Sequence, residues 1–109
     1  MDTHLAVDLG VLTILSGQTE STSMSFRGWR GASQSVSIIG PGTLTGTVKV
    51  QTSEDGIVWR DKQSAGSDIT IAADGDVTIK AVNWKYLRVV SSAAEGGNRE
   101  FIVKGEEGR

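Results

Sequence analysis

Short segments in which apolar and polar residues alternate constrain the fold of this chain more than any other feature. In residues 20–27, Thr22, Met24 and Phe26 share one side of an extended chain, and serines occupy the other side. Residues 44–52 alternate in the same way. A repeat of two residues is typical of a β-strand that is buried on one face. About eight such short segments follow one another roughly every 10 residues, which predicts an all-β fold, an antiparallel β-sandwich or barrel.

Turn sequences separate the predicted strands. Residues 54–56, Glu-Asp-Gly, indicate a hairpin-type turn, because Asp-Gly tolerates the positive φ angles of tight hairpins. Residues 57–63 are then expected to form the return strand. Residues 74–76, Asp-Gly-Asp, predict another tight turn, and residues 40–42, Gly-Pro-Gly, end a strand. No segment has the pattern of a convincing helix.

The composition agrees with a sheet protein. The chain has 11 Val, 8 Ile and 10 Thr against 8 Leu and Met together, and β-branched side chains favour strands because they are stiff and pack well on a pleated surface. A length of 109 residues suits one domain. We therefore expect a single β-sandwich domain over residues 1–109, with flexible ends at 1–4 and 105–109.

Several ligand and location classes are excluded by what the chain lacks. It has no cysteine, so it has neither disulfides nor a thiolate metal site, and its one histidine, His4, cannot build a histidine metal cage. A net charge of −2 argues against nucleic-acid binding. No stretch approaches the ~18 apolar residues that cross a membrane. No targeting segment is visible, so we expect folding in a cytoplasm, which also suits a virion assembled in a host cytoplasm.

The chain also lacks a recognisable catalytic arrangement. It has no Gly-x-Ser-x-Gly motif to present a nucleophile. Four acidic residues, Glu54, Asp55, Asp74 and Asp76, fall at predicted turn tips, where acids are expected because they are solvated and bond to the turn backbone. We predict no catalytic, metal-binding or cofactor-binding residue, and no enzyme activity.

One tryptophan is predicted to belong to the core. Trp59 follows the turn at 54–56 and lies in a predicted strand opposite Val48 and Val50. Leu87 and Val89 share one face of a second dense strand. Large aromatic and aliphatic side chains at such positions usually pack between the sheets, so these five residues are the predicted core.

Another tryptophan is the best candidate for an exposed contact. Trp29 lies between Arg27 and Arg30, and aromatic and arginine side chains are enriched at protein interfaces. Burial of Trp29 under its own loop is an equally open alternative. The apolar N-terminal arm, which includes Leu5 and Val7, is a second candidate, because an edge strand can dock on a neighbouring chain.

Two segments resemble discoidin-like, or galactose-binding-like, jelly rolls. Residues 48–59, Val-Lys-Val-Gln-Thr-Ser-Glu-Asp-Gly-Ile-Val-Trp, are similar to the family's strand–turn–strand pattern. Residues 85–90, Lys-Tyr-Leu-Arg-Val-Val, and the Val-Asp-Leu-Gly of residues 7–10 are similar to two further family strands. The resemblance implies that the fold is an antiparallel β-sandwich of the jelly-roll type. This chain is shorter than the family's domains and lacks their recognition loops and disulfide. Sugar or lipid binding therefore transfers to no particular residue.

Residues 51–59 together with 86–92 also resemble small, cysteine-free structural β-domains of tailed bacteriophages. That resemblance implies a non-enzymatic virion protein, in particular a capsid decoration (cement) protein that binds and stabilises the shell. It would form a homo-oligomer, a dimer or a trimer, with the major capsid protein or another virion protein as partner. Two alternatives stay open, namely a carbohydrate-binding module of a tail or host-attachment protein, and a tail or neck connector.

Overall fold

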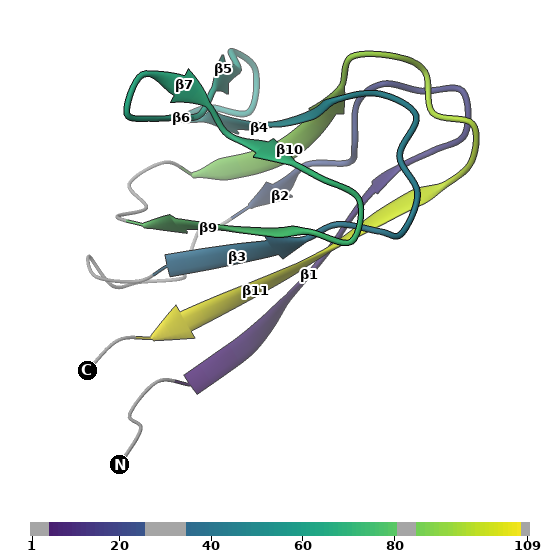
Figure 1. Cartoon of the computed structure of the whole chain (residues 1–109). Coiled ribbons are helices and arrows are strands. Elements are labelled where there is room, and N and C mark those ends of the chain that lie inside the picture. Colours follow the sequence, from purple (N-terminus) through teal and green to yellow (C-terminus); the bar gives the residue numbers. More distant parts are fainter. Residues whose placement is uncertain (1–4, 26–34, 81–84, 108–109) are drawn as a thin grey trace.

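The protein is a two-layered sandwich of antiparallel strands (Figure 1). The computed structural model describes residues 5–25, 35–80 and 85–107, and this part of the chain contains no helix. Its strands are β1 (Leu5–Ile14), β2 (Met24–Ser25), β3 (Ser35–Ile39), β4 (Val48–Ser53), β5 (Arg60–Asp61), β6 (Gln63–Ser64), β7 (Ser67–Asp68), β8 (Thr70–Ile71), β9 (Asp76–Lys80), β10 (Tyr86–Ser91) and β11 (Arg99–Glu107). The predicted all-β sandwich is confirmed, whereas the jelly-roll type stays a prediction.

The strands form two main sheets. The four-stranded sheet has the order β1-β11-β3-β9. The five-stranded sheet has the order β2-β10-β4-β5, and β8 pairs with β4 beside that path. A small hairpin of β6 and β7 completes the structure. Each sheet thus joins segments that are far apart in the sequence, such as β1 with β11 and β10 with β4.

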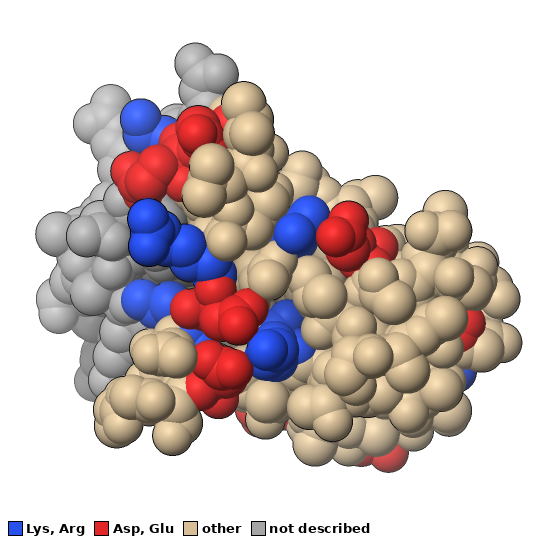
Figure 2. Space-filling model, turned by 90° about the horizontal axis from the view of Figure 1, so that it is seen from above, with Lys and Arg blue, Asp and Glu red and all other residues tan. Residues whose placement is uncertain are grey.

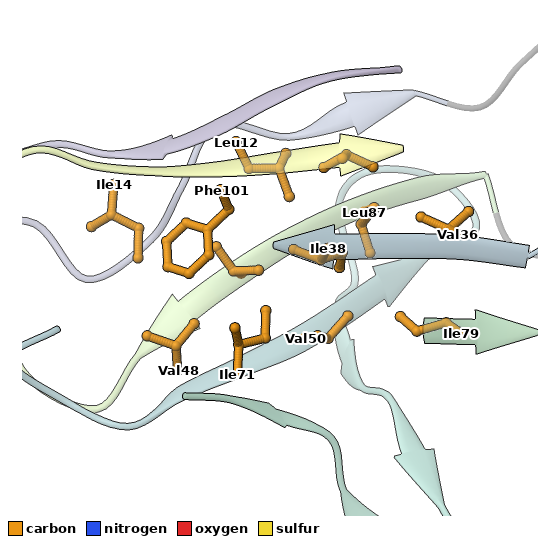
Figure 3. Close-up of a cluster of buried hydrophobic side chains, with 12 residues drawn as sticks. Leu12, Ile14, Val36, Ile38, Val48, Val50, Ile71, Ile79, Leu87 and Phe101 are labelled. Carbon is orange, nitrogen blue, oxygen red and sulfur yellow. The ribbon is translucent and has the colours of Figure 1, made fainter. Parts of the chain in front are cut away.

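The core lies between the two sheets and follows from the alternation in the sequence. Along β10, Leu87 and Val89 are buried, while Tyr86, Arg88 and Val90, which alternate with them, are half-buried. Val48 and Val50 on β4 are likewise fully buried, so four of the five residues predicted for the core lie in it. Figure 3 shows side chains from both sheets pointing toward one another. The whole cluster consists of Leu12, Ile14, Val36, Ile38, Val48, Val50, Ile71, Ile79, Leu87, Val89, Phe101 and Val103.

The fifth predicted core residue, Trp59, does not belong to the core. Its side chain is only half-buried, and its ring centroid lies 4.4 Å from the guanidinium carbon of Arg88. Leu87 and Val89 point inward, so Arg88 between them points outward. Trp59 therefore packs on the outer side of the five-stranded sheet, and the prediction of a core tryptophan is wrong.

The reason is the length of the connection between β4 and β5. The predicted turn exists, since Gly56 has a φ of +80°. However, pairing resumes only at Arg60, opposite Thr52, instead of at the predicted return strand 57–63. The six residues between the two strands therefore form a loop, in which the hydroxyl of Ser53 accepts a hydrogen bond from the Gly56 N–H at 2.8 Å. Trp59 is the last residue of this loop, so the direction of its side chain does not follow the inward–outward alternation of a paired strand.

The first and last strands are paired along almost their whole length. β1 pairs with β11 from Leu5 opposite Glu107 to Ile14 opposite Arg99. Residues 105–107 are therefore strand, and the predicted flexible end at 105–109 is wrong for them. They are held because β11 lies between β1 and β3 and bonds to both, which the charged sequence of this tail does not reveal. Residues 1–4 and 108–109 lie outside the described residues.

A β-bulge divides β1. The pairing register shifts between Asp8 and Gly10, and Gly10 has a φ of +144°. A Cβ at Gly10 would lie 2.9 Å from the terminal methyl of Met24. Glycine is therefore needed here for its backbone conformation, whereas the flexible Met24 side chain could move aside for a Cβ. The bulge turns Leu12 and Ile14 into the core.

Candidate interaction surfaces

The outer face of the four-stranded sheet carries a row of apolar residues, which we call the apolar row. Val11 on β1 lies opposite Ile102 on β11, and Ile102 lies opposite Ile39 on β3. The side chains of Val11 and Ile102 are 47% and 43% exposed, and Ile39 is half-buried. These residues are directly opposite one another across three neighbouring strands, so they form one continuous strip on the surface.

Charged residues flank the apolar row along β11. Glu100 and Lys104 lie two residues before and two residues after Ile102. Phe101 and Val103 between them are fully buried, so Glu100, Ile102 and Lys104 share the outer face. The Lys104 ammonium lies 3.8 Å from a carboxylate oxygen of Asp8. Among the described residues, Glu100 has no ion-pair partner.

The predicted N-terminal docking arm is the edge strand of this sheet. Leu5 and Val7 lie on β1, at positions that pair with Glu107 and Gly105 of β11. Within the described chain, no strand pairs with the outer edge of β1 over residues 5–11. The bulge and Asp8, whose side chain is 85% exposed, are features that discourage another strand from adding to such an edge.

The other three predicted interface residues, Arg27, Trp29 and Arg30, lie outside the described residues. The structure therefore does not bring them together with Leu5 and Val7. The sequence analysis missed Val11, Ile39 and Ile102, although a signal was present. Each of them adjoins a core residue, in the pairs Val11–Leu12, Ile38–Ile39 and Phe101–Ile102. An apolar pair within a strand places one side chain on each face, so it marks an outward apolar residue.

The outer face of the five-stranded sheet is covered by charged groups that bond to one another. The ammonium of Lys49 donates to Asp61 at 3.2 Å and to Asp68 at 3.4 Å. These bonds raise the pKa of Lys49 above its usual value. A hydrogen bond from the Gln51 amide, followed by that from Lys49, lowers the pKa of Asp61. Figure 2 shows the molecule of Figure 1 from above, with acidic and basic side chains intermixed on this side.

Arg88 is the centre of a second group on that face. Its Nε donates to the Gln51 side-chain oxygen at 2.8 Å, and its guanidinium lies 3.5 Å from the carboxylate of Glu20. The Trp59 ring covers the guanidinium from one side, a favourable cation–π arrangement. The charges and the aromatic ring of this face thus satisfy one another within the chain.

The loop between β4 and β5 exposes two aliphatic side chains. Ile57 is 80% exposed and Val58 is 59% exposed. The Asp55 carboxylate accepts hydrogen bonds from both of their N–H groups, at 2.8 and 3.0 Å. The N–H groups of Val58 and Ile57, together with the Ser53 hydroxyl, lower the pKa of Asp55. The loop is therefore ordered by local bonds while its two apolar side chains face the solvent.

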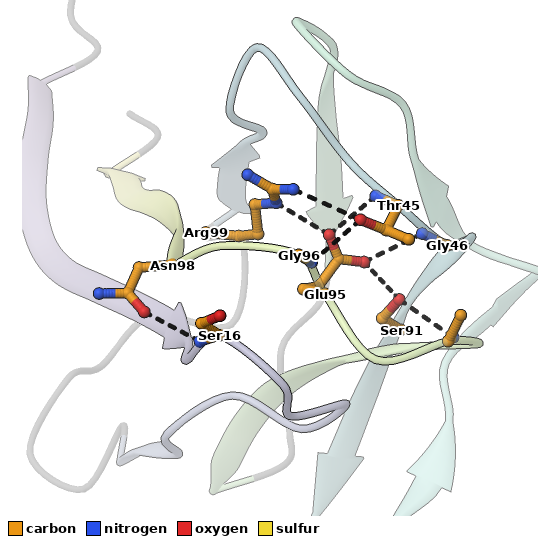
Figure 4. A network of polar contacts seen from close by, with 9 residues as sticks. Ser16, Thr45, Gly46, Ser91, Glu95, Gly96, Asn98 and Arg99 are labelled. Carbon is orange, nitrogen blue, oxygen red and sulfur yellow. Dashed lines mark hydrogen bonds and ion pairs between the residues drawn. The ribbon is translucent and has the colours of Figure 1, made fainter.

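A buried carboxylate seals one end of the sandwich (Figure 4). The Glu95 side chain is fully buried, and its oxygens accept four hydrogen bonds. The donors are the Thr45 N–H at 2.8 Å, the Gly46 N–H at 3.0 Å, the Ser91 hydroxyl at 2.6 Å and the Arg99 Nε at 2.9 Å. Burial raises the pKa of Glu95, but these bonds outweigh it and lower the pKa to about 2.

The Glu95 network holds together three connections between the sheets. Glu95 lies between β10 and β11, and Thr45 and Gly46 lie between β3 and β4. The connection from β1 to β2 joins them, because the Gly17 N–H donates to the Glu95 carbonyl at 2.7 Å. A Cβ at Gly46 would lie 2.5 Å from the Ser91 hydroxyl, so this packing requires glycine. The sequence analysis did not identify Glu95.

The described residues offer no metal centre, since no three His, Asp or Glu side chains among them are grouped to hold an ion. The described part of the chain also contains no helix that is long and apolar enough to cross a membrane. The candidate sites of the described residues are therefore two sheet faces, one with exposed aliphatic side chains and one with charges that bond to one another.

Comparison with known proteins reveals similarity of fold. No family model and no curated protein matches the sequence. The structure is similar to that of YomS, a protein derived from the SPBc2 prophage, with a TM-score of 0.56, 11% identity, and coverage of 97% of this chain and 95% of that chain. A chain from the disulfide-linked pili of Bacillus endospore appendages aligns with a TM-score of 0.44, 15% identity, and coverage of 98% and 89%. At this identity, the likeness to YomS shows a common sandwich fold.

Proposed function

We propose that this chain is a non-enzymatic structural protein of a phage particle, a capsid decoration protein that self-associates and binds the shell. Its location would then be the virion, and its partner the major capsid protein or another virion protein. The apolar row carries the proposal, because exposed aliphatic side chains in a continuous strip on a rigid sheet are typical of a surface that another protein covers. The fold that it shares with a prophage-derived protein supports the phage context.

The rigidity of the sandwich supports this role. Shell binding requires a surface that keeps its shape, because ordering a flexible surface would reduce the affinity. The Glu95 network fixes three connections at one end, and paired strands fix the face of the four-stranded sheet. A protein that attaches at many points of a symmetric shell also gains avidity from weak individual contacts.

The proposal is tested on particles of the phage or prophage whose genome encodes the chain. Purified particles are analysed by mass spectrometry, and immunogold labelling distinguishes a head position from a tail or neck position. Particles from a deletion strain then receive the purified protein, and bound copies and the temperature of shell disruption are measured. We expect binding to heads and a higher disruption temperature.

A matched pair of variants controls this experiment. Ile102→Asp places a charge in the apolar row, whereas Thr70→Asp places one at an exposed strand position of the five-stranded sheet. Because loss of self-association removes the avidity that paired copies gain on the shell, we expect Ile102→Asp to reduce the bound copies at least about tenfold and Thr70→Asp to leave them unchanged. Particles that lack the protein, or deletion particles that bind none, would refute the proposed function, and labelling at the tail would support the connector alternative instead.

A further inference from the structure

We propose that two copies of this chain pack the outer faces of their four-stranded sheets together about a two-fold axis that passes along the apolar row. In this dimer the two β11 strands run antiparallel, and Glu100 of each copy faces Lys104 of the second copy. The inference rests on the self-association in the proposed function and specifies its surface and geometry.

The first argument is the apolar row itself. Val11, Ile102 and Ile39 lie side by side on three strands and leave substantial aliphatic surface in water. A rotation about an axis along the row places each of these side chains over its own equivalent. A two-fold interface needs a patch that is complementary to itself, and the aliphatic side chains on β1, β11 and β3 meet this condition. On the edge strand β9 the row ends in the exposed Asp76, opposite Ile39, so its like charges lie at the rim of the proposed interface and oppose it there.

The second argument is the order of charges along β11. Glu100, Ile102 and Lys104 point outward in turn, with a negative charge about 6.6 Å on one side of Ile102 and a positive charge about 6.6 Å on the other. When the second β11 runs antiparallel over the first, Glu100 meets Lys104 at both sides of the axis. A parallel arrangement would place Lys104 over Lys104 and Glu100 over Glu100. The charges therefore select the antiparallel two-fold.

Both charged groups are available for this contact. Among the described residues, Glu100 forms no ion pair. Lys104 has one partner within the chain, Asp8, at 3.8 Å, and both side chains of that pair are well exposed. Such a long and exposed pair contributes little, so Lys104 can bond to a second carboxylate without a large loss.

Three other routes to self-association are less favourable. Pairing through the edge of β1 would meet the bulge and the exposed charge of Asp8. The loop that exposes Ile57 and Val58 presents only two side chains, which is less than the continuous strip on the sheet. The outer face of the five-stranded sheet has charges that already bond to one another, so burying that face would remove solvent from them without a new partner.

The size of the face sets the strength that we expect. Four strands about 4.8 Å apart, over five residues that each rise about 3.3 Å, give a flat footprint of roughly 300 Å². Standard interfaces bury about 800 Å² on each partner. The dimer should therefore be weak in solution and concentration-dependent, and should be reinforced when many copies attach to one particle.

A charge-exchange experiment tests this geometry. Sedimentation velocity is measured up to about 0.5 mM at low salt for the wild type, Glu100→Lys, Lys104→Glu and the double variant. In either single variant, like charges meet twice in the dimer, and we expect the dissociation constant to rise at least about tenfold. The double variant exchanges the two charges and should recover the wild-type constant to within about threefold.

Mixing the two single variants makes the test specific. A Glu100→Lys copy carries two positive charges beside Ile102, and a Lys104→Glu copy carries two negative charges. In the proposed antiparallel dimer each positive charge then faces a negative one. We expect the mixture to form a heterodimer although neither variant associates alone. Thermal unfolding of each variant establishes that the fold is retained, and Thr70→Asp is the control that should dimerise like the wild type.

The outcomes separate the inference from the proposed function. A wild-type chain that stays monomeric at all concentrations, together with particles that lack it, would refute both. A wild-type dimer that persists in Ile102→Asp and in the single charge variants would overturn only the inference, because association then uses another surface. Single variants that are monomeric but do not combine on mixing would also overturn the antiparallel geometry.

Discussion

The two outer faces of this sandwich differ in whether their side chains find bonding partners within the chain. On the five-stranded sheet, Lys49 bonds to Asp61 and Asp68, and Arg88 bonds to Gln51 and packs against Trp59. On the four-stranded sheet, the apolar row stays exposed and Glu100 has no ion-pair partner among the described residues. The same alternation of residues thus builds one face whose charges bond within the chain and another that leaves aliphatic side chains exposed to solvent.

The largest change in the free energy of unfolding should come from a comparison of the inner and outer sides of the four-stranded sheet. Phe101 and Ile102 are neighbours on β11, one fully buried and one 43% exposed. Phe101→Ala should lower the free energy of unfolding by about 3–5 kcal/mol, because it leaves a cavity in the core. Ile102→Ala should cost under about 1 kcal/mol at protein concentrations where the chain is monomeric. Urea unfolding measures both, and equal losses would show that Ile102 is a core residue.

The next effect concerns the end that joins both sheets. Glu95→Gln should lower the free energy of unfolding at pH 7 by about 2–4 kcal/mol, because Arg99 and the backbone donors lose a buried charged acceptor. The folded-state pKa of about 2 lies below the ordinary value of 4.5. The Glu95 contribution is therefore complete above pH 4.5 and is lost as the pH falls toward 2.

The pH dependence provides the measurement for Glu95. Urea unfolding of the wild type between pH 6 and pH 2 should show a loss of roughly 3 kcal/mol that is missing from the Glu95→Gln variant. Asp55 and Asp61, whose pKa values are also lowered, should leave a smaller acid-dependent loss in both proteins. Identical pH profiles would contradict the assignment of the network to Glu95.

A smaller loss of stability is expected from a substitution on the outer face of the five-stranded sheet. Trp59→Ala should cost about 1–2 kcal/mol, since the change removes a half-buried ring and its contact with Arg88. Leu87→Ala, on the inner side of the same sheet, is the matched control and should cost at least about 2 kcal/mol. If Trp59→Ala proves as costly as Leu87→Ala, the ring belongs to the core after all.

The smallest effect should come from the bonded charges themselves. Lys49→Met removes the bonds to Asp61 and Asp68 but keeps most of the side chain. We expect a small loss of stability at low salt, and a still smaller loss at 1 M NaCl, because exposed ion pairs are screened. Thermal unfolding at the two salt concentrations measures this. A loss that does not change with salt would mean that Lys49 acts by packing.

Much of the fold follows from local patterns. Val48, Val50, Leu87 and Val89 were placed correctly because the direction of a side chain in a strand depends only on its neighbours in the sequence. Trp59 was misplaced because the six residues after Ser53 form a loop in which that alternation does not hold. Residues 105–107 were misplaced because their order comes from pairing with β1 and β3.

The candidate surfaces were less accessible to prediction than the core. The pairs Val11–Leu12 and Phe101–Ile102 indicate that an apolar residue points outward, but they do not indicate that Val11 and Ile102 are neighbours. Glu95 has no signature in the sequence, because its four donors come from residues on one distant connection and two strands. Such sites depend on which distant segments meet.

The sequence by itself determined that this chain forms short strands and which side chains face inward, because both properties depend on the repeat of two residues and on β-branched composition. Only the tertiary structure decided that Val11, Ile102 and Ile39 form one strip, that Trp59 covers Arg88, and that Glu95 closes the end of the sandwich. These arrangements depend on the register between segments that lie up to about ninety residues apart, and register is set by the packing of the whole sandwich.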